Sequence, residues 1–176
     1  MSEELKSREE ILAAIKGDVE AIKKASKELR ENKDFVMQAV SVSGYVLKYV
    51  EEEFKNDTDV VLAAVKQDVY GHSLKYASTE LRSNKDFIRE VITVNPYAFR
   101  QASMELRNDR EFVLELIERN GLAIEGASEE LKNDKELVLK AVAKNGHALA
   151  YASEELRKDK EFLKQAAEAN SDAMEF

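Results

Sequence analysis

One short phrase recurs along this chain at nearly constant spacing. The phrase Ala-Ser-x-Glu-Leu-Arg/Lys-x-Asn/Asp begins at Ala25, Ala77, Ala102, Ala127 and Ala152, with a degenerate copy at Val50 and a remnant at Ser2. The apolar residue inside the phrase, from first copy to last, is Leu5, Leu29, Phe54, Leu81, Leu106, Leu131 and Leu156, so the spacings are 24, 25, 27, 25, 25 and 25 residues. A fixed period in this range predicts a linear stack of supersecondary units, each sheltering its neighbour's apolar side.

Within one period the apolar residues follow the spacing of a helix. In the repeat that begins at Leu131, one helical face holds Leu137, Val138, Ala141 and Val142. Either Asn133 or Asp134 can cap this helix, and Glu136 completes a capping box if Asn133 is the cap. Asn145-Gly146 suits a left-handed turn at the helix end. A second helix is then expected through Ala148, Leu149, Ala152 and Leu156.

The other copies have the same plan. The expected cap positions are Asn32, Asp57, Asn84, Asp109, Asp134 and Asp159, with Arg8 departing from the pattern. The expected turns are Ser43-Gly44, Asn95-Pro96, Asn120-Gly121 and Asn145-Gly146. Pro96 supports this register because proline suits the first turn of a helix, and the two extra residues of the longest copy, Val69 and Tyr70, fall in a turn. The sequence therefore predicts an all-α protein, an α-solenoid of about seven short helical hairpins in a single domain over residues 1–176.

The recurrent charges have a structural interpretation. The residue after the anchor is basic in every copy: Lys6, Arg30, Lys55, Arg82, Arg107, Lys132 and Arg157. An acidic residue follows the anchor by five positions: Glu10, Asp34, Asp59, Asp86, Glu111, Glu136 and Glu161. The basic row could be a ladder for phosphates. A structural interpretation explains both rows, because these charges complement the helix dipoles and can form ion pairs between repeats. We favour this interpretation.

Composition argues against several functions. The formal net charge of −8 disfavours a general nucleic-acid binder, and the absence of cysteine removes thiolate and zinc–cysteine chemistry. The recurring serines of the Ala-Ser pair could suggest nucleophiles. Only His72 and His147 could serve as imidazole bases, however, and small residues in mid-helix that let helices approach closely are the better explanation. Gly121 and Gly126 have phosphate-loop spacing, but Ala127 stands where the lysine belongs. We therefore expect no enzyme activity, cofactor or metal.

A stripe of variable residues is the candidate partner-binding face. Its positions lie four apart on the expected second helices, hence on one face. They are Glu20 with Lys24, Tyr45 with Tyr49, His72 with Tyr76, Tyr97 with Gln101, Leu122 with Gly126, His147 with Tyr151, and Asp172 with Phe176. Tyrosine and histidine are common interface anchors, so Tyr45, Tyr49, His72, Tyr76, Tyr97, Gln101, His147 and Tyr151 are the candidate binding residues. The alternative is that these rings fill the seams between hairpins.

The chain ends and the absence of sorting signals lead to further expectations. The sequence opens with what looks like the end of a second helix and closes partway through another, so we expect a piece of a longer array, with head-to-tail self-association through open ends. No apolar stretch approaches the length of a membrane span, and the acidic start lacks the plan of a secretory signal. The expected location is the cytoplasm, without membrane contact.

The full motif resembles a known repeat family. Ala-Ser-x-Glu-Leu-Arg/Lys-x-Asp-Lys/Arg-Glu-Phe-Val, followed by x-Ala-Val-x-x-Asn-Gly-x-Ala-Leu, is similar to the repeats of the domain of unknown function DUF4116, most closely over residues 77–167. The resemblance implies a helical repeat and carries over no reaction, cofactor or ligand. The leading hypothesis is a non-enzymatic module that binds a peptide or protein on one face of the stack. The alternative is a structural spacer that associates through its helical ends.

Overall fold

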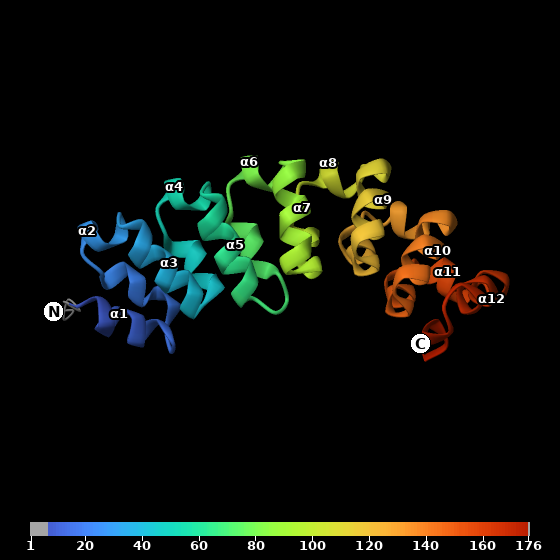
Figure 1. Cartoon of the computed structure of the whole chain (residues 1–176), viewed down its shortest axis with the longest axis horizontal. Coiled ribbons are helices and arrows are strands. Elements are labelled where there is room, and N and C mark those ends of the chain that lie inside the picture. Colours follow the sequence, from blue (N-terminus) through green and yellow to red (C-terminus); the bar gives the residue numbers. More distant parts are fainter. Residues whose placement is uncertain (1–6, 176) are drawn as a thin grey trace. The chain divides into compact units, whose positions relative to one another are not determined.

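The computed structural model describes residues 7–175, and every regular element in that range is a helix, with no strand. The chain divides into two compact units, Met1–Arg82 (unit 1) and Ser83–Phe176 (unit 2), which are described separately (Figure 1). The expected remnant of the phrase at Ser2 to Leu5 and the last stripe residue, Phe176, lie outside the described residues. An all-α helical repeat is therefore confirmed, and the single solenoid over the whole chain stays a prediction.

Unit 1 repeats one order of elements: a longer α-helix, a 3₁₀ helix and a short α-helix. These are α1 (Arg8–Ile15), η1 (Val19–Lys24), α2 (Lys27–Arg30), α3 (Lys33–Val42), η2 (Gly44–Tyr49), α4 (Glu52–Lys55), α5 (Thr58–Gln67), η3 (His72–Tyr76) and α6 (Thr79–Arg82). Helix α3 packs between α1 and α5 (Figure 1). The 3₁₀ helix η2 contacts both η1 and η3. Within this unit, equivalent elements of successive repeats are therefore neighbours.

Unit 2 follows the same order. It contains α7 (Lys85–Val94), η4 (Pro96–Gln101), α8 (Met104–Arg107), α9 (Arg110–Arg119), η5 (Gly121–Gly126), η6 (Leu131–Asn133), α10 (Lys135–Lys144), η7 (Gly146–Tyr151), α11 (Glu154–Lys158), α12 (Lys160–Ala169) and η8 (Ser171–Glu175). Helix α9 contacts α7 and α10, α10 also contacts α12, and η5 contacts η4 and η7. Here the short helix of one repeat, η6, is itself 3₁₀.

The expected second α-helix is wrong, because each copy is broken into two pieces at the Ala-Ser pair. In the last complete repeat, η7 ends at Tyr151, Ala152 has an extended backbone, and α11 begins after Ser153. The Ser153 hydroxyl accepts the Leu156 N–H at 3.2 Å and donates to Asn133 Oδ1 of the preceding repeat at 2.5 Å. The serine is therefore a cap that ends one helix and starts the next, and it does not provide close approach in mid-helix.

The same serine joins neighbouring repeats through its backbone. Ser78 N–H donates to Lys55 O at 2.8 Å, Ser128 N–H to Arg107 O at 2.8 Å, and Ser153 N–H to Lys132 O at 2.9 Å. Each bond links the start of one short helix to the end of the preceding one. A helix of four or five residues is unstable alone, so these contacts help to fix its position.

The predicted caps of the longer helices are confirmed. Asp134 Oδ1 accepts the Leu137 N–H at 3.0 Å, and Asn32, Asp57, Asn84, Asp109 and Asp159 cap their helices in the same way. Of the two caps considered for α10, Asp134 is the one used, so Asn133 is free to contact Ser153. Helix α1 begins one residue earlier than the pattern predicted, with Ser7 as the cap and Glu10 completing a capping box.

The expected left-handed turn at Asn-Gly is wrong. Asn145 has an extended backbone with φ of −156°, and its side chain accepts the His147 N–H at 3.0 Å, which starts η7. Among the described residues only Gly71 has a positive φ, of 68°, in the turn that contains Val69 and Tyr70. The glycines are instead required by close approach. A Cβ on Gly44 would lie 2.2 Å from Ala64 O, and one on Gly121 would lie 2.5 Å from Ala141 O.

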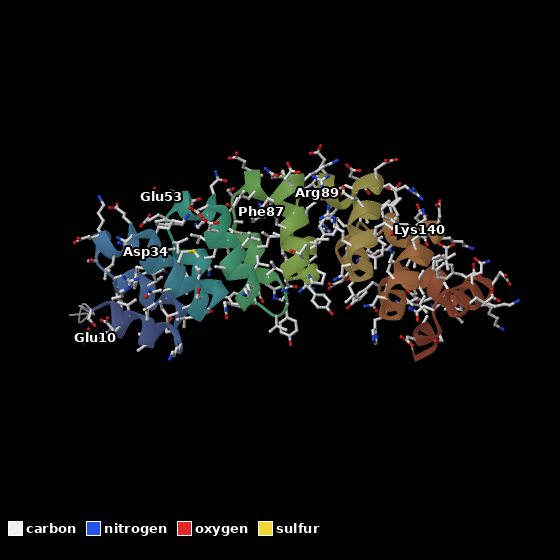
Figure 2. All side chains as sticks on the ribbon, in the orientation of Figure 1. Glu10, Asp34, Glu53, Phe87, Arg89 and Lys140 are labelled. Carbon is white, nitrogen blue, oxygen red and sulfur yellow. The ribbon has the colours of Figure 1, made fainter. Side chains whose placement is uncertain are left out.

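The core consists of the faces that the periodicity predicted. Phe35, Val36, Ala39 and Val40 of α3 are completely buried, as are Val46 and Leu47 of η2. In unit 2, Phe87 of α7 is buried as well, whereas Asp34 and Glu53 of unit 1 are exposed; all three are labelled in Figure 2. Burial of these side chains against the next repeat is the main stabilising contribution, since apolar burial yields about 25 cal/mol per Å².

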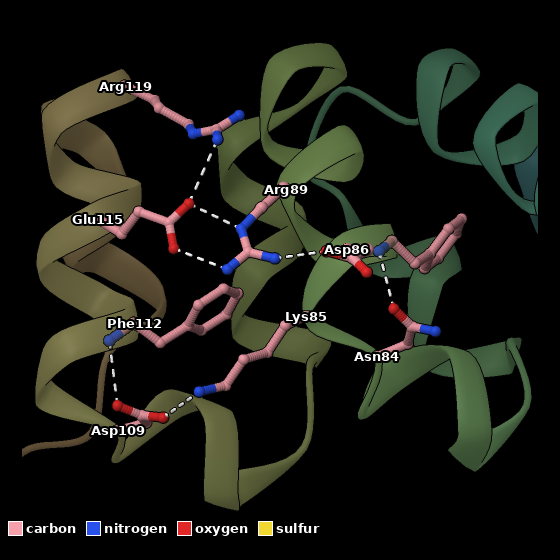
Figure 3. Close-up of polar contacts among 9 residues, drawn as sticks. Asn84, Lys85, Asp86, Arg89, Asp109, Phe112, Glu115 and Arg119 are labelled. Carbon is pink, nitrogen blue, oxygen red and sulfur yellow. Dashed lines mark hydrogen bonds and ion pairs between the residues drawn. The ribbon is translucent and has the colours of Figure 1, made fainter.

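Ion pairs between repeats are present, but a different basic row makes most of them. In four repeats the residue after the cap reaches the cap of the following repeat: Lys33 to Asp57 at 2.7 Å, Lys85 to Asp109 at 2.6 Å, Arg110 to Asp134 at 2.7 Å and Lys135 to Asp159 at 2.7 Å. From the row after the anchor, Arg30 pairs with Glu51 of the next repeat, whereas Arg107 donates to Gly126 O. In Figure 3 the Arg89 guanidinium bridges Glu115 and Asp86 beside the Lys85–Asp109 pair.

Candidate interaction surface

The predicted binding residues of unit 1 lie together on its 3₁₀ helices. Tyr45 and Tyr49 belong to η2, and His72 and Tyr76 to η3. Residues four apart do not share a face there, because a 3₁₀ helix has three residues per turn and residues i and i+3 eclipse. Tyr45 therefore shares its face with Lys48. The ring of Tyr45 is 37% exposed, and Tyr49, His72 and Tyr76 are half-buried, so none of these side chains is a core residue.

Three of these tyrosines line one hollow. It has a volume of about 270 Å³, and its walls are Val19 of η1, Tyr45, Lys48 and Tyr49 of η2, and Tyr76 of η3. Residues from three consecutive repeats thus contribute to one surface of unit 1. The walls combine aromatic rings and an aliphatic side chain with hydroxyl groups and an ammonium group.

Polar bonds hold the rings in place around the hollow. The Tyr49 hydroxyl donates to Glu20 Oε1 at 2.8 Å, and the Tyr45 hydroxyl lies 3.2 Å from His72 Nδ1. Each bond joins adjacent 3₁₀ helices, η1 to η2 and η2 to η3. Lys23 pairs with Glu20 at 2.8 Å. The hydrogen bonds with Lys23 and then Tyr49 lower the pKa of Glu20, so this carboxylate is ionised at neutral pH.

Three lysines surround the tyrosine rings. Lys23 Nζ lies 4.3 Å and Lys48 Nζ 4.9 Å from the centroid of the Tyr49 ring, and Lys75 Nζ lies 4.8 Å from that of Tyr76. These are cation–π distances. Interaction with the Tyr49 hydroxyl raises the pKa of Lys48, which keeps this group charged. The hollow therefore has a cationic border.

Sequence reasoning missed this lysine row. Lys23, Lys48 and Lys75 occupy the same position in three consecutive 3₁₀ helices, and Tyr49 and Tyr76 directly follow the last two. The equivalent residues in unit 2 are Arg100, Glu125 and Ala150. Arg100 pairs there with Glu125 at 3.1 Å. The row of like charges is thus a property of unit 1, and the Lys-Tyr pairs in η2 and η3 were the signal that could have revealed it.

The predicted residues of unit 2 form a separate group. Tyr97 of η4 and Tyr151 of η7 interact through their hydroxyls, although the 3₁₀ helix η5 lies between them in the sequence. Burial and the nearby charge of Glu125 raise the pKa of Tyr151. Gln101 is half-buried at the end of η4, and His147 is exposed at the start of η7. The equivalent of Tyr151 in η5 is Gly126, which has no side chain.

The described residues also bear on metal binding and on membrane crossing. Within residues 7–175, no group of three or more histidine, cysteine, aspartate or glutamate side chains is arranged to hold a metal ion. No helix in the same range is both long enough and apolar enough to cross a membrane.

Comparison with known proteins yields a family. No curated protein and no solved structure matches the chain. One family does match, repeatedly, over residues 7–55, 32–82, 69–107, 109–157 and 134–176. Together these matches extend across nearly all of the sequence. The chain therefore belongs to the family described as Domain of unknown function (DUF4116).

Proposed function

We propose that this protein is a non-enzymatic interaction module that binds a peptide or protein segment on the 3₁₀-helix face of unit 1. The observation that supports it best is the hollow lined by Tyr45, Tyr49 and Tyr76. Tyrosine combines a large apolar ring with a polar tip and loses little conformational entropy on binding, which makes it an effective interface residue. The hydrogen bonds from Tyr45 and Tyr49 to neighbouring helices hold the rings before a ligand arrives.

A cytoplasmic location belongs to the same proposal. The chain contains no cysteine, so its stability requires no oxidising compartment. The helical bonds and ion pairs that hold each unit together all form under reducing conditions.

A peptide-display selection tests the proposal. The immobilised full chain is exposed to a random peptide library, and enriched peptides are assayed against a variant with Tyr45→Ser, Tyr49→Ser and Tyr76→Ser. The matched control is Met104→Ser, which removes an apolar side chain from a unit 2 residue that is 66% exposed and does not line the hollow. Enriched peptides should lose at least tenfold in affinity for the triple variant and keep their affinity for the control.

Two results would contradict the proposal. If the enriched peptides bind the triple variant as tightly as they bind the unchanged chain, the hollow is not the binding site. A chain that enriches no peptides but sediments as an oligomer would favour the alternative, an assembly unit. Circular dichroism of the triple variant checks that its helices are intact.

A further inference from the structure

We infer that the ligand of this face is an acidic segment in polyproline II conformation, with a carboxylate at every third residue. This inference rests on the proposed function and specifies the partner that the lysine row and the hollow would recognise. It depends on the charges, the spacing and the ring contacts of unit 1.

The charges favour an anionic ligand. Among residues 7–175, neither Lys48 nor Lys75 forms an ion pair with a carboxylate, whereas Lys23 is paired with Glu20 at 2.8 Å. Lys48 and Lys75 are both exposed. Lys48 and Lys75 therefore lie beside the hollow without a carboxylate ion pair among the described residues, in a chain whose net charge is −8. A ligand carboxylate at each of these two lysines would pair with it as Glu20 pairs with Lys23.

The spacing favours a ligand with a period of three residues. Lys23 Nζ and Lys48 Nζ lie 4.3 Å and 4.9 Å from the same ring centroid, so they are within about 9 Å of each other. Helices η2 and η3, which carry Lys48 and Lys75, pack against one another, and packed helices lie about 8–10 Å apart. In polyproline II, one turn takes three residues and rises about 9.3 Å, which brings every third side chain to the same face. One turn of the ligand would therefore advance it by one repeat.

The hollow favours proline-rich segments between the carboxylates. Other proteins that recognise polyproline II do so with grooves lined by aromatic side chains. The ligand helix is preformed, so it loses little entropy on binding. Here Tyr45, Tyr49 and Tyr76 supply such a lining next to the lysines. The rings would contact the pyrrolidine side chains while the ammonium groups contact the carboxylates.

A single-stranded nucleic acid fits these observations less well. Nucleic-acid affinity comes largely from neutralising phosphates, which requires a concentrated basic face. The overall negative charge would also oppose a polyanion that extends beyond the hollow. We therefore infer a peptide ligand, and the experiment below includes a nucleic acid for comparison.

Isothermal titration calorimetry of the full chain tests the inference. The probe is a capped peptide of four Glu-Pro-Pro triplets, compared with an isomer that has the same composition but contiguous glutamates. We expect saturable binding of the triplet peptide that is at least fivefold tighter than that of the isomer and weakens in high salt. Lys48→Gln and Lys75→Gln should each weaken binding about threefold to fivefold, the upper part of the range for one exposed ion pair.

Matched variants make the test specific. Lys23→Gln should change the affinity less than twofold because Glu20 already neutralises this lysine. Lys66→Gln, on the exposed part of α5, should have no effect. Glu20→Gln should tighten binding about twofold to threefold, since it releases Lys23 and removes a negative charge beside the hollow. Circular dichroism establishes that each variant keeps its helix content.

Several outcomes would overturn the inference. These are no saturable binding of the triplet peptide, binding that is unchanged by both Lys48→Gln and Lys75→Gln, and equal binding of a Lys-Pro-Pro peptide. Tighter, lysine-dependent binding of a short oligothymidylate would make the row a phosphate site instead. If the display selection yields peptides whose binding depends on the tyrosines but that are not acidic, this inference is contradicted and the proposed function stands.

Discussion

Replacing Gly44 with alanine tests whether successive repeats approach as closely as the structure shows. The added Cβ would lie 2.2 Å from Ala64 O and 3.0 Å from Ala64 C. Ordinary carbon–oxygen contact is near 3.4 Å, so η2 and α5 must separate by roughly 1 Å. Both obstructing atoms belong to the backbone, and no side-chain rotation can relieve the overlap. Such overpacking costs about 1–3 kcal/mol.

An opposing effect on the unfolded state must be weighed against this cost. Alanine restricts the unfolded chain and by itself would stabilise the fold by about 0.4–1 kcal/mol. Gly44 does not have a positive φ, so this gain is available in principle. The steric cost is larger, and the net expectation is destabilisation. For a chain of this size, about 2–4 °C of melting temperature correspond to 1 kcal/mol. Gly44→Ala should therefore melt several degrees below the unchanged protein.

Thermal and urea unfolding followed by far-ultraviolet circular dichroism give the readout. Gly17→Ala is the matched control, because its Cβ would meet only Ala14 O at 3.9 Å. This variant should melt at the same temperature as the unchanged chain or slightly above it. If Gly44→Ala is as stable as Gly17→Ala, the close approach of η2 to α5 is wrong, and so is our explanation for the recurrent glycine.

Three further substitutions test the contacts within and between repeats. Ser153→Ala should lower the free energy of unfolding by about 1 kcal/mol in urea titrations, because it removes a helix cap, while Ser41→Ala, which removes only a hydroxyl bonded to Met37 O, should stay within about 0.5 kcal/mol. Asp109→Asn should keep the cap, as Asn84 does in the preceding repeat, but lose the attraction of Lys85. The hydrogen bond with Lys85 and that with the Phe112 N–H lower the pKa of Asp109, so its stabilisation is present above the unfolded pKa of about 4 and is lost as the pH falls through the folded value. The stability difference between this variant and the unchanged chain should therefore shrink between pH 7 and about pH 3, and a constant difference would refute the assignment. Arg89→Lys should cost no more than about 1 kcal/mol, through loss of the two-pronged contact with Glu115, and high salt should reduce the difference.

Local patterns made part of the fold predictable. The caps at Asp134 and its equivalents depend on a side-chain oxygen that accepts from a backbone N–H three residues along the chain, and the buried face of α10 follows from the spacing of four apolar residues. Both signals lie within one helix. The position of Pro96 at the start of η4 is equally local, since proline fits that position and disrupts a helix interior.

The division of the second helix could not be predicted from spacing. Ala148, Leu149, Ala152 and Leu156 fit an α-helix, but Ser153 interrupts it with a cap and with bonds to Lys132 and Asn133 of the preceding repeat. Those partners are about twenty residues away. The glycine at the turn was misinterpreted for the same reason, because its contact is with the following repeat.

The sequence identified the tyrosines of the candidate surface and missed its lysines. The tyrosines stood out by residue type, and the structure brings Tyr45, Tyr49 and Tyr76 to one hollow. The lysines beside them did not stand out in a chain rich in charge of both signs. Only a 3₁₀ helix makes Tyr45 and Lys48 neighbours on one face, and the sequence had indicated an α-helix there.

Nuclear magnetic resonance mapping tests the central claim, that the 3₁₀ face of unit 1 binds the ligand. The ¹⁵N-labelled full chain is titrated with the capped Glu-Pro-Pro peptide, and amide shifts are followed to saturation. The account predicts that the largest changes fall in η1, η2 and η3, around Tyr45, Lys48 and Tyr76. Changes concentrated instead at the short helices α2 and α4, around Arg30 and Lys55, would contradict it.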